Sequence, residues 1–208
     1  MNMKYIILLL LVISIDCNSQ NRAVIKGTGK EVNLFDDGTW KYVIEEPEGV
    51  LKTDTLVYNR SKESNNLVKS SKLNYGIWMN NKKWSYKKGE DGLQEFNFTL
   101  VGQDAYGIII SERVEIPIDN LLDIALQNAE KAAPDIKVIK KECRRINGKI
   151  VHFMQMEGTL QGIKFVYLGY YYSDSNGSIQ FLTYTSQNLL KQYRNEMETL
   201  LNGFVVNL

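Results

Sequence analysis

The sequence predicts an α+β domain in which an antiparallel β-sheet is flanked by two helices and preceded by a small β-hairpin unit. Two segments, 119–133 and 186–204, carry apolar residues at helical spacings of three and four. Between them, β-rich segments follow one another with short turns, which is typical of an antiparallel meander. Because the apolar faces of two amphipathic helices and of a sheet all need cover, packing the helices on the sheet is the economical arrangement.

The chain begins with a segment typical of a signal peptide, residues 1–19. Lys4 precedes an unbroken apolar run at 5–13, and a polar stretch follows. This run is well short of the roughly 20 residues that cross a bilayer as a helix, so we expect no transmembrane segment in the mature chain. The segment predicts an exported protein, either periplasmic or extracellular.

The end of this segment leaves two ways of processing open. Cys17 and Ser19 are small residues at the −3 and −1 positions of a cut before Gln20. Lipidation of Cys17 would instead give an outer-membrane lipoprotein, although Asp16 stands where such signals carry a small residue. In both cases Cys143 is the only thiol left, so we expect no internal disulfide and a domain stabilised by its core.

Three regions follow the signal segment. Residues 20–43 predict the β-hairpin unit, with β-rich stretches on both sides of a turn whose Gly38 can adopt a positive φ. Since so short a hairpin is marginal in water by itself, we expect it to dock on another surface or to act as an interaction element. Residues 44–73 are mostly polar and predict a linker, and residues 74–208 predict the main domain.

The main domain is predicted to contain two helices among its strands. Asp119 is predicted to cap the first helix and Pro134 to stop it. Ser186 is predicted to cap the second helix, and Gly203 lies where its C-terminal stop is expected. The expected strands are 75–79, 95–101, 105–116, 136–146, 149–156, 163–172 and 179–185.

Residues 75–208 resemble the PsbP-like α/β/α sandwich in the order of their elements. The resemblance rests on a Trp-bearing opening strand, GIWMNNKKW, on the meander, and on a closing helix that ends in LLNGFVV. The stretch KEVNLFDDGTWKYV is similar to a short β-unit at the start of many exported bacterial proteins. The resemblance implies a binding or assembly factor without chemistry of its own, and it transfers no site residue because the fold has no shared catalytic set.

Charge and motif content argue against several classes of function. The 25 lysines and arginines nearly balance the 24 aspartates and glutamates, without blocks of like charge, which argues against nucleic-acid binding. The sequence contains no GxSxG, HExxH, CxxC, Walker or GxGxxG motif. His152 is the only histidine, and its sequence neighbours are strand residues rather than an exposed elbow. We therefore expect a non-enzymatic protein without a cofactor.

One candidate metal site follows from a turn. If Asn147 and Gly148 form a two-residue hairpin turn, Cys143 lies directly opposite His152, and Met154 and Met156 share the face of His152. A thiolate, an imidazole and two thioethers are soft ligands that suit copper(I). The same residue types are also common in protein cores, and a thiol acting with His152 as its base is a third interpretation.

Aromatic residues supply a candidate partner surface. Tyr170 and Tyr172 point to the side of their strand opposite to Tyr171, so one side of this run is a candidate for exposure. We take Trp40, Tyr170 and Tyr172 as this surface, because exposed aromatic side chains often anchor a partner. The partner expected is a protein of the cell envelope.

Overall fold

The computed structural model describes residues 53–90 and 94–207, together with 21–24, 31–34, 38 and 40–42. The chain divides into two compact units, Met1–Glu48 and Gly49–Leu208. The predicted signal peptide, its processing site and the first part of the predicted linker, 44–52, lie outside the described residues.

The N-terminal unit contains three short strands: β1 (Asn21–Val24), β2 (Glu31–Leu34) and β3 (Trp40–Tyr42). They pair antiparallel in the order β1-β2-β3, with Leu34 opposite Trp40. Gly38 lies between these two residues with φ of 80°, a backbone conformation that glycine adopts without strain. The predicted β-hairpin is thus accompanied by a further strand, and its role as an interaction element stays a prediction.

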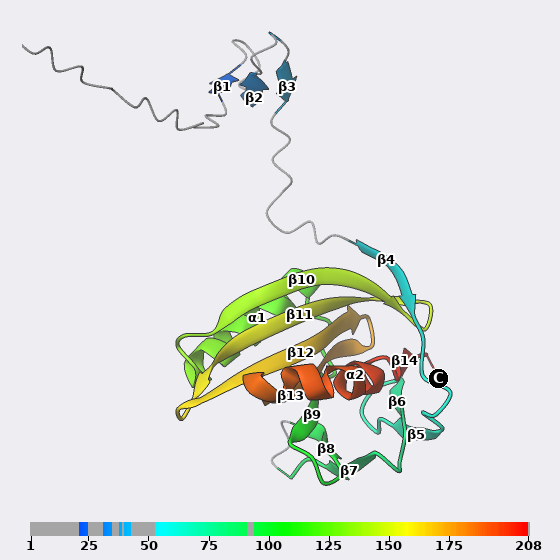
Figure 1. Cartoon of the computed structure of the whole chain (residues 1–208). Coiled ribbons are helices and arrows are strands. Elements are labelled where there is room, and N and C mark those ends of the chain that lie inside the picture. The colour runs from blue at the N-terminus through cyan, green and yellow to red at the C-terminus, as the bar shows by residue number, and fades with distance from the viewer. Residues whose placement is uncertain are drawn as a thin grey trace, which may run out of the picture. The chain divides into compact units, whose positions relative to one another are not determined.

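The second unit is built on an eight-stranded sheet with the order β4-β10-β11-β12-β13-β9-β8-β7 (Figure 1). All neighbours pair antiparallel except β4, which runs parallel to β10. Asn147 and Gly148 both have positive φ, as a two-residue hairpin turn of type I′ requires, and the register that this turn predicts is confirmed. The strands are β4 (Thr53–Tyr58), β7 (Trp84–Lys88), β8 (Gln94–Leu100), β9 (Ala105–Glu112), β10 (Lys137–Ile146), β11 (Lys149–Leu160), β12 (Ile163–Asp174) and β13 (Gly177–Ser186).

Two helices and a small second sheet cover this large sheet. Helix α1 (Ile118–Ala132) packs on one face, and α2 (Leu190–Leu201) packs on the other after a short 3₁₀ turn, η1 (Gln187–Leu189). A three-stranded sheet with the order β14-β6-β5 joins the α2 side. Its strands are β5 (Asn66–Lys69), β6 (Tyr75–Met79) and β14 (Phe204–Val206). The predicted α+β class, with a mostly antiparallel sheet between two helices, is confirmed.

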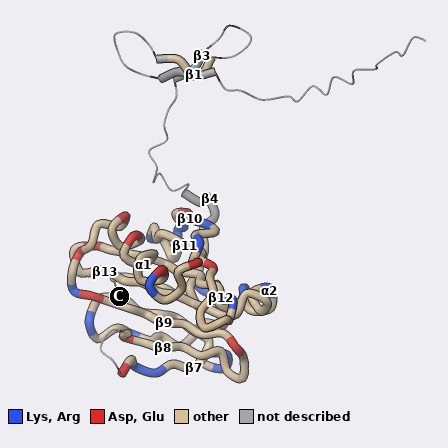
Figure 2. The backbone as a smooth tube through the Cα atoms, turned by 90° about the vertical axis from the view of Figure 1, so that its left-hand side faces the viewer, with Lys and Arg blue, Asp and Glu red and all other residues tan. Residues whose placement is uncertain are grey.

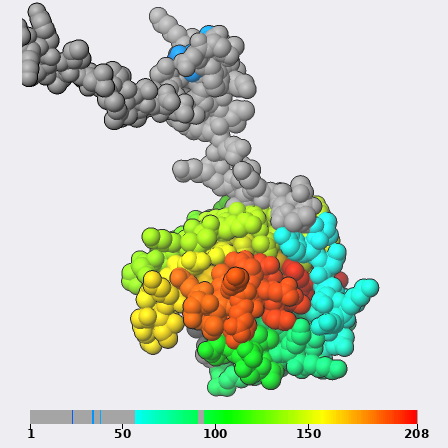
Figure 3. Space-filling model, viewed as in Figure 1, coloured from blue at the N-terminus to red at the C-terminus, as the bar shows by residue number. Residues whose placement is uncertain are grey.

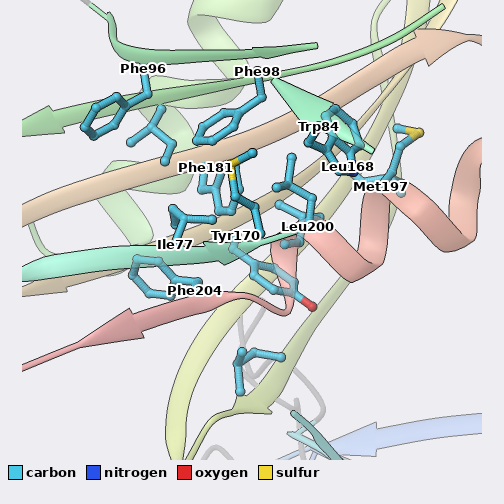
Figure 4. Close-up of a cluster of buried hydrophobic side chains, with 14 of the residues drawn as sticks. Ile77, Trp84, Phe96, Phe98, Leu168, Tyr170, Phe181, Met197, Leu200 and Phe204 are labelled. Atoms are coloured by element: carbon cyan, nitrogen blue, oxygen red, sulfur yellow. The ribbon is translucent and has the colours of Figure 1, made fainter. Parts of the chain in front are cut away.

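The core forms two layers, one on each face of the large sheet. On the α2 side, aromatic rings from β8, β12 and β13 pack against Met197 and Leu200 of the helix (Figure 4). In the space-filling view, α2 lies in orange to red across the middle of this face (Figure 3). On the other side, Leu121, Leu122 and Ala125 of α1 pack on Met154 and Met156. Apolar residues therefore alternate between two buried layers along the central strands, as a sheet covered on both faces requires.

The prediction of a polar linker over 44–73 is wrong for its second half, because β4 and β5 both lie there. Strand β4 pairs with β10, far away in the sequence, and β5 pairs with β6. Both are edge strands, so each gains backbone hydrogen bonds from one neighbour in its sheet. Val57 of β4 is 57% exposed, so this apolar residue does not mark a buried face of the strand.

Both predicted helix caps are also corrected. The first helix starts after Pro117, whose carbonyl accepts a hydrogen bond from the Leu121 amide, and Asp119 lies within the first turn. There its carboxylate favours the helix through the positive end of the helix dipole rather than through a capping hydrogen bond. Ser186 precedes the 3₁₀ turn but makes no side-chain capping hydrogen bond.

Candidate functional site

The Cys143–His152 pair lies on the α1 face of the large sheet. The two residues are direct cross-strand partners on β10 and β11, and Cys143 Sγ lies 3.7 Å from His152 Nδ1. Cys143 is buried and His152 is half-buried, while their neighbour Ile150 is 45% exposed. The pair is therefore placed at the margin of the core rather than in its centre.

The His152 ring is neutral at physiological pH. Burial lowers its pKa below the ordinary value, and the negative charge of Asp119 in α1 offsets only part of this effect. A neutral imidazole has a free ring nitrogen, which can accept a hydrogen bond from a thiol or bind a soft metal ion. The pair is thus chemically competent for either interaction.

The two methionines of the predicted metal site are part of the core. Met154 and Met156 are fully buried in the α1 layer, where they pack with Leu121, Tyr171 and other apolar residues. Residues 53–90 and 94–207 contain no cluster of three or more histidine, cysteine and acidic side chains that could hold a metal ion. A copper(I) site at Cys143 and His152, with Met154 and Met156 as further ligands, therefore stays a proposal.

The predicted partner surface is wrong at Tyr170. Its ring is 1% exposed beneath α2, and its hydroxyl donates a hydrogen bond of 2.7 Å to Asn202 Oδ1. Tyr172 is half-buried and packs edge-on against Phe204, with ring centroids 5.9 Å apart. The prediction allowed one side of this strand to be uncovered, but α2 and the small sheet together cover the side on which Tyr170 and Tyr172 lie. The side chain of Trp40 lies outside the described residues.

A buried carboxylate, Glu95, is a feature that the sequence analysis missed. Oε1 accepts hydrogen bonds from the Ser70 hydroxyl at 2.7 Å and from the Ser71 amide at 3.0 Å. Oε2 accepts from the Tyr75 hydroxyl at 2.7 Å and from the Ser111 hydroxyl. These donors come from three different elements, and no local sequence pattern places them around one glutamate.

The hydrogen bonds to Glu95 affect its pKa more strongly than its burial does. Burial alone would raise the pKa of Glu95, but the donors hold the pKa below its ordinary value, with Ser111 the strongest of them. The carboxylate is therefore charged at neutral pH and ties β6, on the small sheet, to β8 and β9 of the large one. The hydrogen bonds of Glu95 therefore stabilise the fold.

A different set of aromatic residues, of which three tyrosines are half-exposed and Phe165 is buried, lines a depression that we call the aromatic hollow. Its volume is about 300 Å³. The rings form a connected row: Phe165 and Tyr167 have centroids 4.9 Å apart, and Tyr184 lies 5.4 Å from both Tyr167 and Tyr106. The lining residues are Asp104, Tyr106, Leu160, Gln161, Ile163, Phe165, Tyr167, Tyr184, Thr185 and Ser186.

Strand register brings this row together. Tyr167 of β12 pairs with Tyr184 of β13, which pairs with Tyr106 of β9, so the three rings stand on one face at neighbouring positions. Leu160 and Ile163 face each other at the end of the β11–β12 hairpin and are 40% and 62% exposed. Tyr167 and Tyr184 lie on consecutive strands of the predicted meander, whereas Tyr106 is placed by a pairing that is not local in sequence.

The hollow carries a carboxylate among its otherwise neutral lining. The Tyr106 hydroxyl donates a hydrogen bond of 3.0 Å to Asp104 Oδ1, and this carboxylate raises the pKa of Tyr106. Burial raises the pKa of Tyr167 and of Tyr184, with the other phenols adding to the effect at Tyr184. All three phenols are therefore protonated at neutral pH.

A second, more polar depression adjoins the first. Its volume is about 430 Å³, and Tyr106 and Tyr184 line both depressions. The further lining includes Lys87, Glu90 and Asn97. Together the two depressions give an open surface that is apolar at the β11–β12 hairpin and polar towards β7 and β8. Over the rest of the domain, positive and negative residues are interspersed (Figure 2).

Comparison with solved structures tests the fold. Cyanobacterial PsbP (CyanoP) from Synechocystis matches with a TM-score of 0.52 at 14% sequence identity, over 68% of this chain and 92% of CyanoP. The second unit has a PsbP-like fold. The resemblance predicted from the order of its elements is thereby confirmed for the PsbP-like domain.

Two further structures are similar to the PsbP-like domain. A protein of unknown function from Pseudomonas aeruginosa has a TM-score of 0.45 at 13% identity, over 69% of this chain and 97% of its own. A crystal structure from Bacteroides thetaiotaomicron has a TM-score of 0.46 at 10% identity, over 70% of this chain and 49% of its own. No protein-family model and no curated protein matches the sequence.

The comparisons identify a fold, and a fold alone does not specify a ligand. What the PsbP-like domain binds therefore depends on the residues at its surface. None of the helices in the described part of the chain is long and apolar enough to cross a membrane.

Proposed function

We propose that the protein is an exported, non-enzymatic binding or assembly protein of the cell envelope, and that the aromatic hollow is the surface that contacts its partner. The observation that carries this proposal is the row of Tyr106, Tyr184 and Tyr167, which stays half-exposed beside the α1 layer. Tyrosine rings are rigid contact groups with an apolar body and a polar tip, and they are common at the energetic centre of interfaces.

Other features support the same function. The signal-like segment 1–19 supports export, and the sequence contains none of the familiar catalytic motifs. Exposed Leu160 and Ile163 extend the apolar contact area of the hollow. The N-terminal β-unit with Trp40 is proposed as a second contact element, since the aromatic residues of so short a unit have little core of their own to fill.

Site-specific photo-crosslinking in the native cell envelope tests this proposal. We expect a benzophenone amino acid at Ile163, on the rim of the hollow, to give one dominant crosslinked protein. The same amino acid at Val114 is the matched control, because Val114 is 58% exposed against 62% for Ile163 and lies beyond the opposite end of β9. Crosslinked species are read by mass spectrometry.

The crosslink should also depend on the tyrosines. We expect a Tyr167→Leu/Tyr184→Leu variant, which keeps apolar bulk, to lose most of the crosslink while retaining a cooperative thermal transition. Equal crosslinking at Ile163 and Val114, or a crosslink that survives in the folded double variant, would contradict the role of the hollow.

A copper(I)-handling function is the second candidate, and the 3.7 Å contact between Cys143 Sγ and His152 Nδ1 favours it. Two soft ligands at this separation suit copper(I), and the lowered pKa of His152 keeps the imidazole available. We expect purified protein to take copper(I) from a competing chelator, with a loss of at least about tenfold in affinity in Cys143→Ser, because the thiolate is the strongest ligand type present.

The methionines provide the control for this titration. Met154→Leu keeps the core filled and removes only the thioether, so it separates ligation from packing. If Cys143→Ser and His152→Gln both bind copper(I) as tightly as the unmodified protein, the proposed site is wrong.

A further inference from the structure

The aromatic hollow combines three kinds of surface, aliphatic, aromatic and acidic, that a single side chain can contact at once. Leu160 and Ile163 form an exposed aliphatic edge. The rings of Tyr184 and its neighbours present faces and edges at several angles, from 27° for the Tyr106–Tyr184 pair to 60° for the Tyr167–Tyr184 pair. Asp104 places a carboxylate at the same depression. An aliphatic stem that ends in a cation matches this sequence of surfaces.

We propose that the aromatic hollow is the anchor pocket for a lysine side chain of the partner protein. The methylene stem lies along Leu160 and Ile163, and the ammonium group lies between the tyrosine rings and Asp104. This inference rests on the proposed function, because it names the group by which the partner is held.

Charge complementarity favours a cation in this pocket. The faces of aromatic rings carry partial negative charge and attract an ammonium group, most strongly where water is partly excluded. Asp104 adds a full negative charge, and its hydrogen bond with Tyr106 orients the carboxylate beside the rings. The raised pKa values of Tyr167 and Tyr184 agree with a partly desolvated site.

The cation–π contacts within the described part of the domain involve rings outside the aromatic hollow. Within residues 53–90 and 94–207, cation–π contacts are made by Arg60 over Trp78 and by Arg144 over Tyr58, Phe153 and Tyr170. In this part of the chain no lysine or arginine lies over a ring of the hollow or forms an ion pair with Asp104. No cation of these described residues therefore occupies the hollow, which leaves it open to a cation of a partner.

The geometry favours lysine over arginine. Arginine is recognised best by a carboxylate that offers both oxygens to its planar fork. Here an arginine fork would share Oδ1 of Asp104 with the Tyr106 hydroxyl, whereas a compact ammonium group needs only one oxygen. The lysine stem also has four methylene groups, which suit the aliphatic edge of the hollow.

A pair of matched probes tests the inference on the purified full chain. N-acetyl-lysine-N-methylamide carries the stem and the ammonium, and N-acetyl-norleucine-N-methylamide carries a comparable stem without the charge. Chemical shifts of the tyrosine rings are followed by NMR during each titration. We expect the lysine probe to bind roughly tenfold more tightly, the size that a cation–π contact and a half-exposed ion pair give together.

Three variants assign the preference to the hollow. Asp104→Asn should reduce the preference for lysine by a few fold, and raised salt should do the same to the unmodified protein. Tyr184→Leu should weaken the lysine probe while leaving the norleucine probe nearly unchanged. Glu115→Gln, which removes an exposed carboxylate outside the lining of the hollow, should leave both affinities as they are.

Three outcomes would overturn the inference. The first is equal affinity for the two probes, and the second is a lysine preference that persists in Asp104→Asn and Tyr184→Leu. The third is found in envelope extract: acetylation of its lysines should abolish the crosslink at Ile163, and a crosslink that survives acetylation contradicts a lysine anchor while leaving the proposed function intact. A crosslink that never depends on Tyr167 and Tyr184 would instead contradict the proposed function.

Discussion

Replacing Glu95 with alanine is expected to lower the free energy of unfolding of the PsbP-like domain by about 3–5 kcal/mol. The side chain is buried, and its two oxygens accept four hydrogen bonds. Removing it leaves the buried hydroxyls of Tyr75 and Ser111 without their acceptor and removes the hydrogen bonds that link the small sheet to the large one through this residue. Urea unfolding followed by circular dichroism measures the change.

An exposed glutamate between β7 and β8 provides the control. The side chain of Glu90 is 85% exposed and pairs with Lys87 at 3.3 Å. Because exposed ion pairs contribute little, Glu90→Ala should change the free energy of unfolding by less than about 0.5 kcal/mol. Similar effects of the two substitutions would contradict a special role for the buried carboxylate.

Glu95 should also make the free energy of unfolding depend on pH in the acidic range. Because hydrogen bonds lower the pKa of Glu95 in the folded state, its contribution is present above the ordinary glutamate pKa of about 4.3 and is lost as pH falls through the lower, folded pKa. Glu95→Gln keeps the shape but cannot titrate. The difference in stability between the unmodified protein and this variant should therefore shrink below about pH 4.

The sequence predicted what local periodicity determines. Alternation along strands and the turn at Asn147 and Gly148 were enough to place Cys143 opposite His152. The same alternation separates Tyr170 from Tyr171, which lie in the α2 layer and the α1 layer respectively. Both helices were also found, because each has a continuous apolar face.

What the sequence missed depends on contacts between distant segments. Strand β4 pairs parallel with β10, a strand far away in the sequence, and its short sequence TDTLVY gives no strand pattern of its own. Tyr170 is buried because β14 and α2 pack over it, which alternation cannot reveal. Tyr106 joins the aromatic hollow only through the pairing of β9 with β13. Such pairings are set by tertiary packing rather than by neighbouring residues.

Arg144 is the second residue at which a large effect is expected. Its guanidinium group is buried, lies 3.6 Å from the centre of the Phe153 ring and forms a 2.7 Å ion pair with Glu142. Its Nη1 also donates to the Tyr170 hydroxyl at 3.4 Å. Arg144→Met keeps the stem but removes these contacts, so we expect the free energy of unfolding to fall by about 3 kcal/mol.

Two further variants separate charge from packing. Arg145 is the next residue on β10, is exposed and points to the opposite face, so Arg145→Met should change stability by less than about 0.5 kcal/mol. Glu142→Leu/Arg144→Met removes both charges of the 2.7 Å pair, and we expect it to recover part of the loss, because the single variant leaves the buried Glu142 carboxylate with Lys140 as its remaining ion-pair partner, at 2.6 Å. If Glu142→Leu/Arg144→Met is instead less stable than Arg144→Met, the ion pair itself contributes net stability. In that case the buried charges strengthen the contact between β10 and the α2 layer.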